Sequence, residues 1–185
     1  MLPITVYGDK ILRKKAARVT EVDLKIIELI KNMFDTMRNA NGIGLAANQV
    51  GVDKAIFVVD VSQVEDYEDT KPIAFINPKI ISRSDKKILM EEGCLSIPDV
   101  REEVRRPDAV TIVYHDTDLQ EQTMDVDGLM ARVIQHEYDH LQGILFTDLI
   151  SDDLKKKHKK DINKIRKRKV DIDYPITENA DYQLA

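Results

Sequence analysis

The sequence predicts an α+β fold in which mostly antiparallel β-sheets pack around a central helix. One further helix is expected near the N-terminus and a basic helix near the C-terminus. Two amphipathic helical patterns bracket a run of β-branched segments, and this order is typical of helices packed on an antiparallel sheet. Hydrophobic residues make up 43% of the 185 residues, enough to bury a real core. The length fits one domain, or one domain with an appendage.

The first helix is expected over residues 23–41. Asp23 is a suitable N-cap, and Gly42 favours a stop because glycine takes the left-handed conformation cheaply. Large apolar residues recur at three- and four-residue spacing and form one stripe: Ile26, Ile27, Ile30, Met33, Phe34 and Met37.

Five strands are expected between the helices, because five segments are rich in β-branched residues and are separated by turn signals such as Asn77-Pro78. These segments are Ala55–Val61, Ile73–Ile81, Lys87–Glu92, Ala109–His115 and Gln120–Val126.

The central helix is expected to begin near Asp127 and to end at Gly143. Four of its residues share one face at helical spacing: Leu129, Val133, His136 and His140. Since the two histidines continue an apolar stripe, they are expected to point inward.

A third helix is expected over residues 151–169, and the tail from Val170 on is polar and is expected to be loosely ordered. Between Leu154 and Lys169, ten basic residues and one acidic residue give +9, which leaves −14 for the rest of a chain with a formal net charge of −5. The sequence is therefore divided into a main body, residues 1–150, and an appendage, residues 151–185. An acidic body with a basic appendage raises the question of a polyanionic partner.

The single cysteine excludes a disulfide scaffold. The first residues lack the apolar region of a secretory signal, and no run approaches the roughly 18 apolar residues that a membrane span needs. A cytoplasmic location without membrane contact is therefore expected.

The strongest functional signal is the segment from His136 to His140, which reads His-Glu-Tyr-Asp-His. Positions i and i+4 of a helix lie one above the other, so two imidazoles there can hold one metal ion. Glu137 beside the first histidine could then reach water at that ion. A chance match on an ordinary helix surface is the competing interpretation, and the inward-facing stripe argues against it.

Two histidines leave a catalytic metal site one protein ligand short. Cys94 carries the only thiol in the chain, and a thiolate is a good ligand for a borderline ion. Taken alone, Cys94 would rather be interpreted as a small buried hydrophobe.

A third element is the segment from Gly42 to Gln49, whose glycines and small residues let the backbone approach a ligand closely. Gln49 could donate a hydrogen bond to a developing oxyanion. Alone, the segment would be interpreted as a turn after a helix, and it lacks the glycine spacing of a dinucleotide site.

Together these elements resemble the peptide deformylase family. That family carries GΦGΦAAxQ, EGCLS and QHExDHLxG segments in this order, where Φ is apolar. The chain matches them at residues 42–49, 92–96 and 135–143, and the likeness runs from Pro3 to about Leu149. The resemblance makes residues 1–150 a deformylase catalytic domain.

The resemblance implies removal of the formyl group from the N-terminal formylmethionine of newly synthesised polypeptides, with release of formate. It implies that Cys94, His136 and His140 bind one divalent metal ion, with Fe(II) favoured and Zn(II), Co(II) or Ni(II) also suited to these ligands. Metal-activated water would attack the formyl carbon, and Glu137 would act as general acid and base. Gln49 and the Leu95 backbone N–H would hold the oxyanion.

Further roles follow from the same resemblance. Ile43, Leu129 and Val133 are candidates to line the methionine pocket, beside Gly44, although core packing explains them equally well. Arg101 matches a position near the substrate backbone, or is a solvated surface residue. Glu92 is expected to pair with a buried group near the metal, and Asp139 to hold the ligand helix.

The basic segment Leu154–Lys169 would dock on ribosomal RNA, or would simply be a solvated helix face. Deleting residues from Lys155 on would then weaken ribosome binding and spare hydrolysis of a short formyl peptide.

Two other functions remain open at this stage. One is a cysteine hydrolase with Cys94 as nucleophile and a histidine as base. The other is a non-catalytic, ribosome-associated module with a structural metal, although structural zinc sites have four protein ligands.

Overall fold

A computed structural model describes residues 1–184 and confirms the α+β fold. The helices of this part of the chain are α1 (Leu24–Asn39), α2 (Gly128–Leu141) and α3 (Asp152–Arg166), besides three short 3-10 turns. The strands are β1 (Gly44–Ala46), β2 (Ile56–Val59), β3 (Ile73–Arg83), β4 (Lys87–Cys94), β5 (Ile97–Pro107), β6 (Ala109–His115) and β7 (Glu121–Asp127). None of the described helices is long and apolar enough to cross a membrane.

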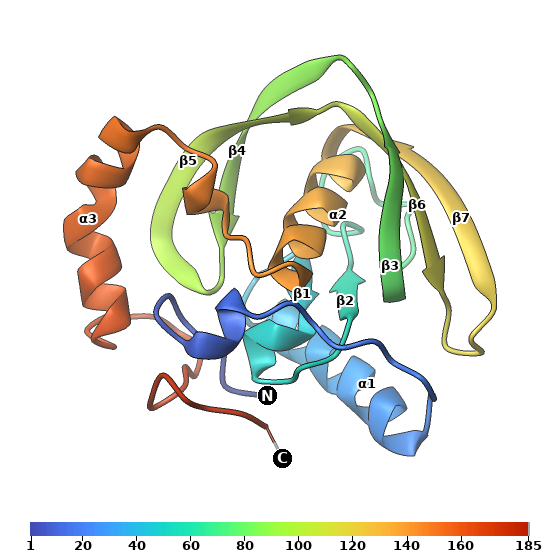
Figure 1. Ribbon diagram of the computed structural model, residues 1–185, viewed down its shortest axis with the longest axis horizontal. Coiled ribbons are helices and arrows are strands. Elements are labelled where there is room, and N and C mark those ends of the chain that lie inside the picture. Colours follow the sequence, from blue (N-terminus) through green and yellow to red (C-terminus); the bar gives the residue numbers. More distant parts are fainter. Residues whose placement is uncertain (185) are drawn as a thin grey trace.

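The strands form two antiparallel sheets on either side of α2. Five strands pair in the order β1-β2-β3-β6-β7, and β4 and β5 form a separate hairpin. In Figure 1, α2 lies between this hairpin and the five-stranded sheet, and α3 lies at the outer edge beside β5. The central position of α2 places its side chains where both sheets can contact them.

The main core lies between the five-stranded sheet and α2. Phe57 stacks on Phe75 with ring centroids 4.6 Å apart, and Ile112 and Ile134 pack in the same cluster. Each of these side chains is fully buried, and complete burial of a side chain of this size contributes about 1.5–3 kcal/mol. The core therefore holds one face of α2 firmly while its other face borders a cleft.

Helix α1 covers a second cluster on the opposite face of the sheet. Its N-cap Asp23 accepts a hydrogen bond from the Ile26 N–H at 2.9 Å, as the sequence predicts. The apolar stripe differs in one respect, because Ile27 is 42% exposed and Leu29 is buried instead. The buried stripe therefore begins at Leu29 and continues through Met33 to Met37.

Strand β5 was missed by sequence interpretation, as was the short β1. The segment Ile97–Pro107 has proline at both ends and many charged residues, which disfavour a strand assignment. In the structure its buried side chains alternate with exposed ones, so Val100 and Val104 enter a third core cluster. Most of its charged residues face outward, whereas Arg106 is buried. Strand pairing with β4 supplies the stability that local propensity lacks.

The expectation of a loosely ordered tail is wrong for the described residues up to 184. The buried Asp9 carboxylate accepts hydrogen bonds from Thr177 Oγ1, at 2.5 Å, and from the Arg168 guanidinium. Ile4 and Ile176 form a parallel bridge, and the Leu184 N–H donates to the Gly51 carbonyl at 2.9 Å. Composition indicated mobility, but contacts with the N-terminal segment fix the tail in place. The division of the chain at residue 150 stays a prediction.

Candidate metal centre

The structure brings Cys94, His136 and His140 together beside α2. Cys94 ends strand β4, whereas the two histidines lie one turn apart on the helix. One potential ligand atom from each of the three lies within 4.8 Å of the other two. The Cys94 Sγ atom is 3.2 Å from His140 Nε2, and the two imidazole centroids are 5.0 Å apart. A thiol and two imidazoles from distant segments therefore converge on one point.

Glu92 fixes the orientation of His136. Its Oε2 atom lies 2.8 Å from His136 Nδ1, which leaves Nε2 on the cavity side of the ring. Arg106 and Arg132 also donate to the Glu92 carboxylate, at 2.6 and 2.7 Å. Burial alone would raise the pKa of Glu92, but hydrogen bonds from His136 and Arg106 outweigh it, so the pKa lies well below 4.5. Glu92 is thus an anion held inside the protein by three cationic or potentially cationic groups.

Asp139, about one turn after His136 on α2, joins the same network. The Arg106 guanidinium donates to Asp139 Oδ2 at 2.6 Å while it also binds Glu92. Arg106 therefore ties the hairpin to the helix that carries both histidines. This is the contact through which Asp139 can hold that helix.

The two histidines have opposite electrostatic surroundings. Burial would lower the pKa of His136, but the thiol of Cys94 and the carboxylate of Glu92 raise it well above 6.5. Burial and the charge of His136 lower the pKa of His140 well below 6.5. The Glu92 carboxylate therefore distinguishes the two imidazoles, since it contacts the His136 ring directly.

Glu137 lies next to this cluster and is itself buried. Its Oε2 atom has no hydrogen-bond partner within residues 1–184. Burial raises the pKa of Glu137 to about 7, with Glu92 adding to the rise and His136 opposing it. A Cβ atom on Gly44 would stand 2.5 Å from Glu137 Oε1, so only glycine leaves this carboxylate room. The result is a carboxyl group poised to take up or release a proton near neutral pH.

Gln49 holds the turn that follows β4. Its Nε2 atom donates to Ser96 Oγ at 3.1 Å and lies 3.4 Å from Cys94 Sγ, while its Oε1 atom accepts from the Ala46 N–H at 2.8 Å. Both ends of the amide are thus engaged in the described chain. To donate a hydrogen bond to an oxyanion, Gln49 Nε2 would have to leave the Cys94 sulfur and turn to the substrate.

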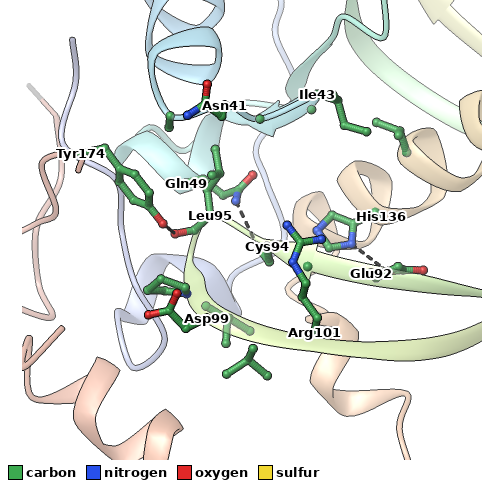
Figure 2. Close-up of a pocket in the computed structure, with 18 of the residues that line it drawn as sticks. Asn41, Ile43, Gln49, Glu92, Cys94, Leu95, Asp99, Arg101, His136 and Tyr174 are labelled. Carbon is green, nitrogen blue, oxygen red and sulfur yellow. Dashed lines mark hydrogen bonds and ion pairs between the residues drawn. The ribbon is translucent and has the colours of Figure 1, made fainter. Parts of the chain in front are cut away.

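A cavity of about 610 Å³ opens beside the cluster (Figure 2). Its lining includes every residue that the sequence nominated for catalysis or binding except His140, namely Ile43, Gly44, Gln49, Cys94, Leu95, Arg101, Leu129, Val133, His136 and Glu137. His140 is only 1% exposed and lies behind the cavity wall. Arg101 stands at the rim, with its side chain 69% exposed and 3.6 Å from the Glu91 carboxylate.

Several residues at the site escaped sequence interpretation. Arg106 and Arg132 gave no local signal, because an isolated arginine is ordinarily a surface residue. Asn48, whose Nδ2 donates to the His140 carbonyl at 2.6 Å, was inside a nominated segment but had no assigned role. Tyr174, which lines the cavity, lies in the tail that was expected to be loose. Only their contacts in three dimensions identify these four.

The donor set fits a divalent metal ion. One thiolate and two imidazoles suit borderline ions such as Fe(II) or Zn(II), and three protein ligands leave a position for a reactant. The Glu92–His136 contact is the carboxylate–histidine arrangement that orients metal-ligating imidazoles in proteins. An α+β fold with such a cluster, a buried acid of raised pKa and an open cleft is typical of metal-dependent hydrolases.

The comparisons with known proteins identify the family. The family described as polypeptide deformylase matches residues 1–156, so the chain belongs to that family. Its members are hydrolases that act on N-formyl amides. A peptide deformylase of Pelodictyon phaeoclathratiforme is 48% identical over 185 residues, covering 100% of this chain and 98% of the relative. One of Chlorobium phaeovibrioides is 46% identical over 176 residues, covering 95% and 92%.

Solved structures give the same result. The peptide deformylase of Ehrlichia chaffeensis superposes with a TM-score of 0.82 at 37% identity, covering 91% of this chain and 97% of the other. That of Thermus thermophilus superposes with a TM-score of 0.83 at 34% identity, covering 91% and 99%. The expected family and fold are therefore confirmed.

Proposed function

We propose that this chain removes the formyl group from the N-terminal formylmethionine of newly synthesised polypeptides and releases formate. The observation that carries the proposal is the convergence of Cys94, His136 and His140 beside the free carboxyl oxygen of Glu137 in an open cleft. Membership in the deformylase family supports the substrate assignment.

Cys94, His136 and His140 would hold one divalent ion, with Fe(II) the favoured candidate and Zn(II), Co(II) or Ni(II) alternatives. Such an ion supplies Lewis acidity, which polarises a carbonyl and acidifies water. The thiolate makes the site less Lewis-acidic than three neutral ligands would. More of the rate enhancement then falls to the protein's own donors and to its acid–base group.

Glu137 is the proposed acid and base. Its pKa of about 7 means that it can accept a proton from the attacking water near neutral pH. The same carboxyl can then deliver that proton to the amine nitrogen as the C–N bond breaks.

Gln49 and the Leu95 N–H are the proposed oxyanion donors. Both line the cavity beside Cys94, and one donor of this kind is typically worth about 3 kcal/mol of transition-state stabilisation. Ile43, Leu129 and Val133 supply the apolar part of the lining and are the candidates to bind the methionine side chain. Arg101 at the rim would bind the substrate backbone farther from the reacting carbon.

Formate release from a formyl-Met tripeptide tests this proposal, with acetyl-Met of the same sequence as the control. We expect formate from the first peptide and no acetate from the second, because an extra methyl group must fit between Glu137 and the ligand cluster. Equal hydrolysis of both peptides, or of neither, would count against the proposal.

A cysteine hydrolase is the second candidate, and one observation favours it. The Cys94 thiol is 3.2 Å from His140 Nε2, which is close enough for a thiol–imidazole pair. A second histidine one turn away has no role in that chemistry. A chelator separates the two candidates, since it would abolish metal-dependent hydrolysis and spare thiol-dependent hydrolysis. Membership in a hydrolase family argues against a purely binding module.

Helix α3 is the proposed ribosome contact. One face of the helix packs on β5 through Ile165, and His158 lies 2.6 Å from the Glu102 carboxylate. Lysines such as Lys156 and Lys160 are exposed on the other face. An exposed row of positive charge suits RNA phosphates through a salt-sensitive contact.

A further inference from the structure

The chain returns to the cleft after α3. Arg168 and Thr177 both bind the buried Asp9 carboxylate, so residues 169–176 form a loop that is held at both ends. The Thr177 N–H also donates to the Ile4 carbonyl at 3.0 Å. This loop, which we call the return loop, is therefore a fixed part of the body and not a free tail.

The return loop supplies one wall of the cleft. Residues 171–174 line the same cavity as Cys94 and Glu137. In Figure 2 the Tyr174 ring reaches across from this loop towards Leu95. The Tyr174 hydroxyl donates to the Leu95 carbonyl at 2.8 Å, and burial raises the pKa of Tyr174 above its usual 10.0, so the phenol stays a neutral donor.

Leu95 is the tip of the turn between β4 and β5. Its neighbour Ser96 is held twice, by the Tyr7 N–H on its carbonyl at 2.8 Å and by Gln49 on its hydroxyl at 3.1 Å. Cys94 before it belongs to β4. Leu95 lies between these two residues, and the hydrogen bond from the Tyr174 hydroxyl holds its carbonyl.

This turn carries two groups of the site, the Cys94 thiol and the Leu95 N–H. Reacting groups must be held closely, since a misplacement of about 1 Å can cost about 100-fold in rate. We propose that Tyr174 is a positioning residue for the hydrolytic reaction: its hydroxyl fixes the Leu95 carbonyl and thereby sets the orientation of this turn relative to Glu137. The expected effect of Tyr174 on the hydrolytic rate rests on the proposed function, whereas its expected effect on the Cys94 thiol does not.

The Tyr174→Phe variant tests the proposal, because it removes only the hydroxyl. Tyr182→Phe is the matched control, since Tyr182 lies in the same tail but packs on Gly51 away from the cleft. Loss of one neutral hydrogen bond at Leu95 predicts a fall in kcat of roughly two- to tenfold for formyl-Met peptide. KM stays unchanged, because the hydroxyl acts through Leu95 and does not touch the substrate. Tyr182→Phe keeps the wild-type kcat.

A second readout is independent of turnover. Cys94 is the only cysteine, so its alkylation by iodoacetamide in metal-free protein can be followed without interference. A turn released by Tyr174→Phe exposes the thiol more often, and we expect alkylation to accelerate by roughly two- to tenfold. Tyr182→Phe leaves the rate unchanged.

The outcomes separate the two proposals. Wild-type protein that releases no formate contradicts the proposed function, and the alkylation rates still decide the role of Tyr174. An unchanged kcat and an unchanged alkylation rate in Tyr174→Phe overturn the inference. A raised KM with unchanged kcat also overturns it, because Tyr174 would then bind the substrate. A lower melting temperature without an effect on kcat or alkylation would also overturn it, because Tyr174 would then only stabilise the fold.

Discussion

Glu92 and His136 are joined by a 2.8 Å contact between a carboxylate oxygen and Nδ1, buried between the β4–β5 hairpin and α2. The contact links the ligand cluster to the arginine network, because the same carboxylate also accepts hydrogen bonds from Arg106 and Arg132. Glu92 therefore orients a proposed metal ligand and also joins the β4–β5 hairpin to α2. Changes at Glu92 should therefore alter metal affinity and stability together.

Glu92→Gln tests this coupling. The variant keeps the shape of the side chain but leaves the buried Arg132 without an anion and Arg106 with Asp139 alone, which costs about 3–5 kcal/mol of unfolding free energy. Loss of the carboxylate behind His136 should also weaken metal binding by about 10–100-fold. Urea unfolding and metal competition measure the two effects. Glu91→Gln, at the exposed neighbouring position, is the control and should change neither.

Glu137→Gln separates catalysis from metal binding. Glu137 contributes no atom to the ligand cluster, so the variant should retain its metal. Turnover should fall by about 10²–10⁴-fold, which is the usual contribution of a general acid or base. Metal content and formate release are measured on the same sample, with Glu121→Gln on β7 as the control. Retained turnover in Glu137→Gln would remove Glu137 from the mechanism.

The Asp148–Arg13 pair predicts an acid-sensitive contribution to stability. Burial would raise the pKa of Asp148, but hydrogen bonds from Arg13 and the Leu145 N–H lower it below 3.8. A lowered pKa means that the stabilisation is present above about pH 3.8 and is lost as the pH falls through the folded-state pKa. Asp148→Asn should therefore destabilise the protein at pH 7, and the difference from the wild type should shrink at pH 2.5. Urea unfolding at both pH values measures this, with Asp69→Asn as a surface control. An equal loss at both pH values would contradict the pairing.

The proposed ribosome contact is testable by charge reversal. Deleting residues from Lys155 on, the test suggested by the sequence, would also remove the return loop from the cleft wall, so it no longer isolates α3. Reversal of Lys156, Lys160 and Lys164 to Glu leaves the loop intact, because all three face solvent. Ribosome binding at low salt should fall while hydrolysis of a short formyl peptide is unchanged.

A matched control places the same charge change elsewhere. Reversal of the exposed Lys25, Lys31 and Lys71 alters the net charge equally without touching α3. If both variants lose ribosome binding to the same extent, the contact depends on net charge and not on α3.

The sequence was informative where a signal was local. The spacing of His136 and His140 requires only that their segment be helical, and hydrophobic periodicity made that clear. Family resemblance added Cys94, which no spacing rule could connect to a helix 42 residues away. The cleft residues Ile43, Leu129 and Val133 were nominated in the same way, and all three line the cavity.

What the sequence did not reveal depends on contacts between distant segments. Strand β5 is stable because it pairs with β4, although its charged residues and prolines argue against a strand. The position of Tyr174 depends on Asp9, which lies at the opposite end of the chain. A polar composition predicted mobility there, because composition does not record the partners that a buried carboxylate provides.

The central claim is that one divalent ion, held by Cys94, His136 and His140, is required for deformylation. The most direct measurement is the rate of formate release by chelator-treated protein as Fe(II) or Co(II) is added back without oxygen. We expect no formate above background at first, and then a rate that rises with the added ion and levels off at one ion per chain. A metal-free protein that releases formate at the full rate would contradict the claim.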